Sequence, residues 1–116
     1  MIKVKDIREP PSGKDGIRIY VGREWPRGVK RTKVQPFEWR LDLAPSEELY
    51  QWLGRDPRKY LRFRTRYRTE LLHHVNELAE LVIEAEKGTV TLLCSSRDAH
   101  QCDSSVLKEL LDEVLY

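Results

Sequence analysis

The chain has 116 residues, of which 40% are hydrophobic and 34% charged, and its formal net charge is +2. This length and composition exclude a disordered chain and predict one globular domain, residues 1–116, with a single core. No apolar run approaches the roughly 20 residues of a membrane span, and the first residues lack the apolar stretch of a signal peptide. We therefore expect a cytoplasmic protein that has no membrane as a partner.

Charge is distributed unevenly along the chain. Residues 1–68 hold 18 Lys and Arg against 9 Asp and Glu, whereas residues 69–116 hold 3 against 10. The two parts therefore carry net charges of +9 and −7. Some of this asymmetry cancels when the halves pack together, so it is only weak support for an anionic partner.

The first third of the chain predicts two strands and a long loop. Apolar residues alternate with lysines from Ile2, breakers collect over residues 9–16, and the alternation resumes over residues 17–21. Residues 22–36 contain two glycines and two prolines without a steady period. They predict a long loop, and loops of this length often carry function.

Helical patterns fill the middle of the chain. Residues 36–43 predict a short helix, and residues 46–54 predict a second one that begins at a serine N-cap and ends at glycine. The best-defined helix covers residues 56–87, where apolar side chains recur every three or four residues, with a break near residues 73–74. His74 falls on this apolar stripe, so we expect it in the core.

The last third predicts a strand, a polar loop and a helix. Residues 89–94 form a nearly continuous apolar run, which is typical of a central parallel strand covered on both faces. A polar loop follows over residues 95–101, and Asp103 or Ser104 caps a final amphipathic helix. The order of elements predicts an α/β fold: a single compact domain with a small, mostly parallel sheet of about three strands flanked by helices in Rossmann-like layers.

Two loops begin at the carboxyl ends of the expected strands, where open α/β sheets bind ligands. They contain forked arginine donors, serine hydroxyls and a tryptophan ring, and the final helix adds free amides at its positive end. We predict a site for an anionic small molecule, such as a phosphate-bearing metabolite, formed by Arg23, Trp25, Arg27, Ser95, Ser96 and Arg97. The structural alternative is that Trp25 and Pro26 plug their loop, Arg23 pairs with Asp98 or Asp42, and the serines only cap. No glycine-rich nucleotide-binding loop is present.

Catalysis and metal binding have little support in the sequence. Cys94 ends a strand and Cys102 lies close to a helix start, where amide dipoles lower a thiol's pKa. Arg97 follows Cys94 more closely than arginine follows cysteine in the phosphate loop of cysteine phosphatases, so Cys94 is interpreted as buried filler. The two cysteines with His100 and Asp103 lack a recognised ligand spacing. We expect two reduced thiols, with a disulfide between Cys94 and Cys102 as the alternative in a hyperthermophile. We expect no metal, and we assign no catalytic residue or cofactor.

The helix after Asp56 carries a second candidate site. At about 100° per residue, five cations fall on one face, roughly 120° from the aromatic stripe. They are Arg55, Arg58, Lys59, Arg62 and Arg66. Such a face can bind nucleic acid through phosphates, independently of sequence. It can equally be a solvated surface or dock on the acidic half of a neighbouring molecule. A protein-interaction adaptor without a small ligand is the third interpretation.

Several segments together resemble a known family. Residues 15–28 read Asp-Gly-Ile-Arg, a hydrophobic strand and Trp-Pro-Arg-Gly; Trp39, residues 43–49, residues 63–67 and residues 90–98 follow in a matching order. These segments resemble the YeaO-like family, catalogued as a domain of unknown function, DUF488. The resemblance covers nearly the whole chain and implies a compact α/β fold without an established activity.

Two positions depart from the family pattern. Gly22 stands where the family commonly has Asp, and Cys102-Asp103 stands where it commonly has Asn-His or Cys-His. The resemblance therefore gives no support to acid–base work by an aspartate or a histidine at these positions of this chain.

Overall fold

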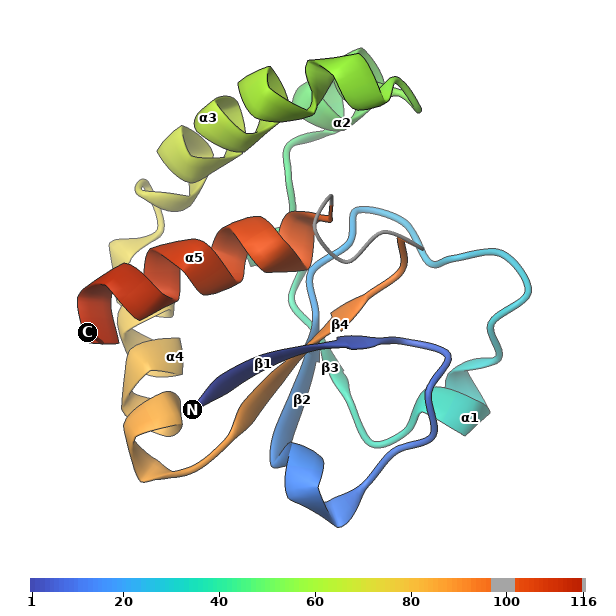
Figure 1. Ribbon diagram of the computed structural model, residues 1–116, viewed down its shortest axis with the longest axis vertical. Helices are drawn as coiled ribbons and strands as arrows, with labels where there is room; N and C mark the ends of the chain where they lie inside the picture. Colours follow the sequence, from blue (N-terminus) through green and yellow to red (C-terminus); the bar gives the residue numbers. More distant parts are fainter. Residues whose placement is uncertain (97–101, 116) are drawn as a thin grey trace.

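The computed structural model describes residues 1–96 and 102–115, which are built around one parallel sheet (Figure 1). Four strands lie in the order β1-β4-β2-β3 within the described residues, and each neighbouring pair is parallel. The strands are β1 (Ile2–Asp6), β2 (Ile17–Tyr20), β3 (Glu38–Trp39) and β4 (Val90–Cys94). The prediction of an α/β fold with a parallel sheet is confirmed.

Helices and short turns connect these strands. The helices are α1 (Arg31–Val34), α2 (Glu47–Leu53), α3 (Tyr60–Leu71), α4 (Val75–Lys87) and α5 (Asp103–Leu115). The 3-10 turns are η1 (Gly13–Asp15), η2 (Leu41–Leu43) and η3 (Pro57–Lys59). No helix in the described ranges combines the length and the apolar character needed to cross a membrane.

The short helix predicted over residues 36–43 is instead an edge strand followed by a 3-10 turn. The amide of Arg40 donates to the carbonyl of Tyr20 at 2.8 Å, which extends the pairing of β3 with β2. The ring of Trp39 lies against those of Tyr20 and Trp25. Packing of this aromatic side chain decides the local structure against the helical pattern. The prediction of about three strands was therefore wrong, because it missed this edge strand.

The helix predicted over residues 56–87 is divided, and the break lies where the sequence placed it. His74 has a non-helical backbone, with φ −113° and ψ 49°, and is the N-cap of α4. Its side chain is 40% exposed, and its Nδ1 lies 3.9 Å from Oε2 of Glu77. The expectation that His74 lies in the core was therefore wrong, because the chain turns there and α4 leaves in a new direction (Figure 1).

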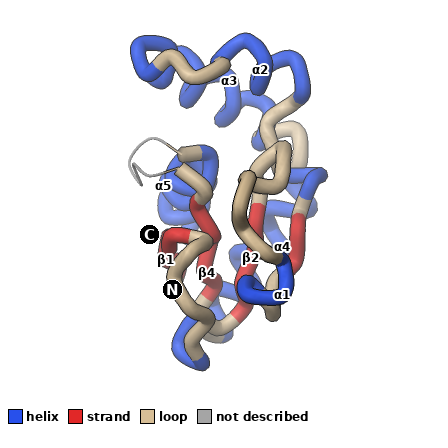
Figure 2. The backbone as a smooth tube through the Cα atoms, turned by 90° about the vertical axis from the view of Figure 1, so that its right-hand side faces the viewer, coloured by secondary structure: helices blue, strands red, loops and turns tan. Residues whose placement is uncertain are grey.

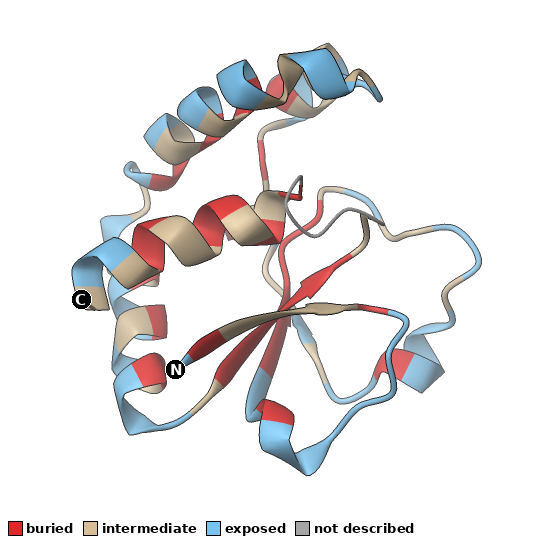
Figure 3. Cartoon of the chain, in the orientation of Figure 1, coloured by how far each residue is buried: buried red, intermediate tan, exposed pale blue. Residues whose placement is uncertain are grey.

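Each face of the sheet packs against its own layer. Successive side chains of a strand point to opposite faces, so Leu92 and Leu93 of β4 enter separate cores. Leu92 lies in the larger core, which α2 to α5 share. Leu93 lies in a smaller core with Tyr20, Val34 and aromatic side chains of the loop over residues 21–37. All of β4 is buried (Figure 3), as predicted for a central strand.

A buried carboxylate joins several elements on the smaller-core face. Asp15 is 2% exposed, and its Oδ2 lies 2.5 Å from Nη1 of Arg18 and 3.0 Å from Nζ of Lys5. The amide of Ser12 also donates to this Oδ2 at 3.0 Å, which completes a capping box on η1. The hydroxyl of Thr91 donates to the Asp15 carbonyl at 2.7 Å. Asp15 therefore links β1, β2 and β4 through its own short turn.

The guanidinium of Arg18 uses its remaining donors on the loop that follows α1. Arg18 is 4% exposed; its Nε donates to the carbonyl of Pro36 and its Nη2 to that of Val34, both at 2.9 Å. A buried arginine is tolerated only when its charge and its donors are matched. The ion pair with Asp15 and these two carbonyls supply that match.

Asp15→Asn removes the charge and keeps the shape. Arg18 and Lys5 would then lack their carboxylate in a buried setting, so we expect the free energy of unfolding to fall by about 3–5 kcal/mol. Urea unfolding measures the loss. Asp6→Asn is the control, because its exposed pair with Arg8 has side chains 37% and 43% exposed and should lose less than about 1 kcal/mol. Equal losses in the two variants would contradict the assignment.

The same carboxylate predicts a pH dependence. Burial alone would raise the pKa of Asp15, but hydrogen bonds from Lys5, the Ser12 amide and Arg18 outweigh it and lower the pKa from 3.8 to about 2. The stabilisation is therefore complete above the unfolded pKa and is lost as the pH falls through the folded pKa. We expect the free energy of unfolding to drop by about 2 kcal/mol between about pH 5 and pH 2 through this group. Urea unfolding at several pH values measures this free energy, which should fall less steeply with decreasing pH in Asp15→Asn than in the wild type. An equally steep fall in both proteins would refute the prediction.

Candidate functional site

The residues of the predicted small-anion site occupy separate environments. Nε of Arg23 lies 3.2 Å from Oε2 of Glu47, so this guanidinium is already paired. Arg27 is exposed and has no ion-pair partner among the described residues. Ser95 is half-buried, and Arg97 lies outside the described residues. Convergence of Arg27 with Arg97 stays a prediction.

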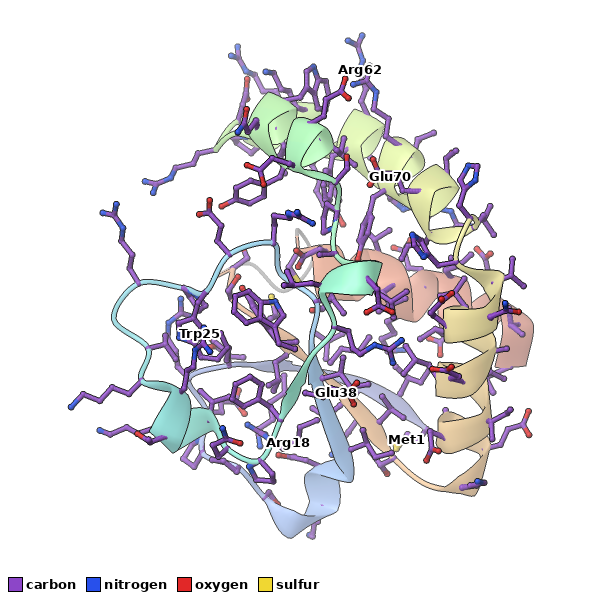
Figure 4. All side chains as sticks on the ribbon, turned by 180° about the vertical axis from the view of Figure 1, so that it is seen from behind. Met1, Arg18, Trp25, Glu38, Arg62 and Glu70 are labelled. Atoms are coloured by element: carbon purple, nitrogen blue, oxygen red, sulfur yellow. The ribbon has the colours of Figure 1, made fainter. Side chains whose placement is uncertain are left out.

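Trp25 belongs to an aromatic cluster. Its ring centroid lies 5.3 Å from that of Tyr20, 5.1 Å from that of Phe37 and 5.6 Å from that of Trp39. Its Nε1 donates to the carbonyl of Val29 at 2.6 Å. Figure 4 shows Trp25 turned into the loop on this side of the sheet. The tryptophan of the Trp-Pro-Arg-Gly segment therefore packs its own loop, as in the structural interpretation of the sequence.

A cavity of about 360 Å³ lies beside Arg23, between the end of β3 and the α3–α4 turn. The carboxylates of Asp42 and Glu70 line it together with His73 and His74. Positive charge is therefore not concentrated here, and an isolated anion gains little from the one arginine that reaches the cavity.

The arginines of α3 divide into two sets, of which the first faces α5. Nε of Arg64 lies 2.7 Å from Oε2 of Glu109, and Nη2 of Arg68 lies 2.8 Å from Oε2 of Glu113. Both acids belong to the negatively charged second part of the chain. These intramolecular ion pairs neutralise the first set, Arg64 and Arg68.

The second set is Arg62 and Arg66. Together with Arg55 of the turn after α2, and with Arg58 and Lys59 of η3, they form the outer α3 face, which we define as Arg55, Arg58, Lys59, Arg62 and Arg66. All are exposed except Lys59, which is half-buried. Arg58 pairs locally with Asp56, and its side chain remains 90% exposed. Arg55 and Arg62 pair with no carboxylate of the described residues. Figure 4 shows Arg62 pointing away from the body of the molecule, and Figure 2 shows α2 and α3 at one end of it.

Trp52 lies beside the outer α3 face. The guanidinium carbon of Arg66 is 4.4 Å and Nζ of Lys59 is 5.1 Å from the Trp52 ring centroid. Trp52 and Arg66 also line a groove of about 460 Å³ between α2 and α3, whose lining includes Thr65, Thr69 and the carboxylates of Glu48 and Glu70. The sequence analysis named the cations and missed this ring. The signal present was a tryptophan shortly before an arginine run, a combination typical of single-strand-binding surfaces.

A side-chain clamp fixes the outer α3 face relative to α2. Glu70 accepts hydrogen bonds from the amide of Ser46 at 2.8 Å and from its hydroxyl at 2.6 Å. The same hydroxyl caps α2 by accepting from the amide of Leu49 at 3.1 Å. One turn earlier on α3, Tyr67 is buried and donates to the carbonyl of Leu43 at 2.6 Å. These contacts therefore hold α2, which carries Trp52, in a fixed position beside the cations of the outer α3 face.

The two departures from the family pattern have separate structural settings. A Cβ on Gly22 would lie 2.0 Å from the hydroxyl oxygen of Tyr20, which is buried and donates to the carbonyl of Glu24 at 2.6 Å. An aspartate at position 22 would therefore require Tyr20 to move. Asp103 begins α5, and burial raises the pKa of its carboxyl.

Comparisons with known proteins identify the family of the chain. A family model described as "Inactive DUF488-N3 subclade" matches residues 1–116. The chain is 36% identical over 110 residues to "Uncharacterized protein YeaO" of Escherichia coli, covering 95% of this chain and 96% of that protein. It is 32% identical over 111 residues to "Uncharacterized protein Rv3073c" of Mycobacterium tuberculosis, covering 96% and 93%. No solved structure matches.

Glu70→Gln tests the clamp. Glutamine keeps one acceptor oxygen and has an N–H donor in place of the other, so one of the two hydrogen bonds from Ser46 loses its acceptor and the charge of the carboxylate is removed. We expect a loss of about 1–2 kcal/mol in the free energy of unfolding and faster hydrogen exchange in α2. Urea unfolding and exchange measurements give the two values. Glu86→Gln, an exposed site on α4, should change stability by less than about 0.5 kcal/mol. If α2 exchanges equally fast in both variants, the clamp does not hold α2.

Proposed function

The chain belongs to the YeaO-like DUF488 family, and we propose that it is a non-catalytic protein that binds the phosphate backbone of nucleic acid through the outer α3 face. Support for a role without catalysis comes from the description of the matching subclade as inactive. It also comes from Gly22, which stands where the family pattern has an aspartate capable of acid–base chemistry.

The observation that carries the proposal is the division of the arginines on α3. Arg64 and Arg68 are neutralised by carboxylates of α5. Arg62 and Arg66, on the same helix, are exposed and pair with no acid among the described residues. The fold thus leaves two uncompensated arginines together on one side of α3, where an external anion can approach them without displacing an internal partner.

The arrangement of these cations favours a polymer over a single small anion. Arg62 and Arg66 lie one helical turn apart, about 6 Å along the axis, and do not converge on one point. A row of cations suits a row of phosphates, and Trp52 beside it offers an aromatic ring of the kind on which unpaired bases stack. Binding of this type is strong at low salt and largely independent of sequence.

A small anion at the carboxyl edge of the sheet is the second candidate, supported by the exposed Arg27. Arg23 and Trp25 contribute less to it than the sequence suggested, because one is paired with Glu47 and the other is packed. Inorganic phosphate is the probe for this candidate. Thermal stabilisation by phosphate that disappears in Arg27→Ala would support it.

Salt-dependent binding tests the primary proposal. Anisotropy of a labelled single-stranded oligonucleotide, measured over a range of NaCl concentrations, should give a linear log–log decrease in affinity. Replacing both Arg62 and Arg66 by Ala should weaken binding and reduce the slope by about 0.7 per arginine, or about 0.9 per arginine for a duplex.

The matched control replaces Arg64 and Arg68 by Ala. It removes the same charge from the same helix, but on the side that α5 occupies, so the slope should hardly change. An equal effect of both double variants would show that net charge alone matters and would refute the site. Absence of binding at low salt would refute the function and would leave the adaptor role, which predicts a protein partner instead.

A further inference from the structure

Two cysteines meet where β4 ends and α5 begins. Cys94 is the last residue of β4, and Cys102 directly precedes α5, with its carbonyl accepting from the amides of Ser105 and Val106 at 3.1 and 3.4 Å. The residues are 1% and 5% exposed. Their thiols are hydrogen-bonded to each other. Neither belongs to the outer α3 face, so the inference below is independent of nucleic-acid binding.

A buried hydrogen bond beside the two cysteines holds the start of α5 against the end of β4. Ser104 is fully buried in the first turn of α5, and its hydroxyl donates to the carbonyl of Leu93 at 2.7 Å. This bond joins the residue before Cys94 to one close after Cys102. The Sγ of Cys94 lies 3.5 Å from the Ser96 carbonyl oxygen, which is a second acceptor for its one proton, and the Sγ of Cys102 lies 3.3 Å from the hydroxyl oxygen of Ser105.

We propose that Cys94 and Cys102 are a redox pair that a peroxide converts into an intramolecular disulfide and that a thiol reductant restores. The Cys102 thiolate attacks one peroxide oxygen, the oxygen–oxygen bond breaks, and the departing hydroxide takes up the proton that Cys102 had lost. The sulfur of Cys94 then attacks the resulting sulfenic acid, and the second hydroxide leaves as water with the Cys94 proton. Two thiols lose two electrons, and hydrogen peroxide becomes two waters.

The two cysteines have different roles in this step. The hydrogen bond to Cys102, together with burial, raises the pKa of the Cys94 thiol, so Cys94 keeps its proton. The hydrogen bond from Cys94 lowers the pKa of Cys102, helped by the hydroxyl of Ser105 and opposed by burial and by Asp103. A helix start also favours a thiolate. Cys102 is therefore the attacking sulfur, and Cys94 resolves the intermediate.

Peroxide titration of the native full chain tests the proposal. After each addition the protein is denatured, remaining thiols are alkylated, and the peptides are separated by mass spectrometry. Trypsin cleaves after Arg97, so Cys94 and Cys102 fall on different peptides. We expect both thiols to be lost together, one peroxide consumed per chain, and a linked pair of peptides that dithiothreitol separates. Persistence of both thiols, or oxidation of one while the other stays alkylatable, would overturn the proposal.

Single serine variants separate the roles. Cys94→Ser should accumulate a sulfenic acid on Cys102 that dimedone traps, whereas Cys102→Ser should give no adduct and no disulfide within the chain. Dimedone labelling of Cys94 in Cys102→Ser would reverse the assignment. Thermal unfolding verifies that both variants fold. If one variant does not fold, the rate of disulfide formation by peroxide is compared between native wild-type protein and wild-type protein unfolded in urea. The rate should be lower in urea, because the fold no longer holds the sulfurs together. An unchanged rate would refute the role of the fold.

Discussion

The buried ion pair between Asp15 and Arg18 is the constraint on which the rest of the structure depends. Removing two charges from water costs free energy that only a complete set of partners offsets, so each remaining donor of Arg18 must find a carbonyl. The backbone has to approach closely as well: Gly16 has φ +62°, and a Cβ there would lie 2.1 Å from the carbonyl oxygen of Thr89. The Asp-Gly-Ile-Arg segment of the family resemblance is therefore structural.

This constraint decides what the long loop after β2 can do. Because Arg18 binds the carbonyls of Val34 and Pro36, the loop is pulled back across the sheet and its aromatic side chains fill the smaller core. The loop is therefore packed against the sheet, and we do not expect it to close over a ligand. Charged side chains remain exposed on α2 and α3, beyond the other face of the sheet, and for this reason we propose the binding function there.

Local patterns predicted the elements, whereas contacts between distant residues set the site. Alternation gave the strands, and Asp56 with its proline marked the start of the divided helix, because these signals act within a few residues. The sequence showed that α3 has a basic face, but not that α5 would cover a neighbouring one: Arg64 and Glu109 are 45 residues apart. The roles of Trp39 and Trp52 were not predicted for the same reason, because each ring acquires its role from a partner on another element.

The uneven charge of the chain acquires a more specific meaning from the α3–α5 contact. Arg62 and Arg66 precede Arg64 and Arg68 by two residues, which is about 200° around a helix. The buried apolar stripe of α3 fixes the rotation of this helix; the ion pairs with α5 lie on one side of the stripe, and Arg62 and Arg66 are turned outward on the other. The same pairs occupy Glu109 and Glu113, so these acids are less able to receive the basic face of a neighbouring copy. The outward arginines stay exposed to solvent, and the regularly spaced charges of a phosphate backbone are the anions that we propose they bind.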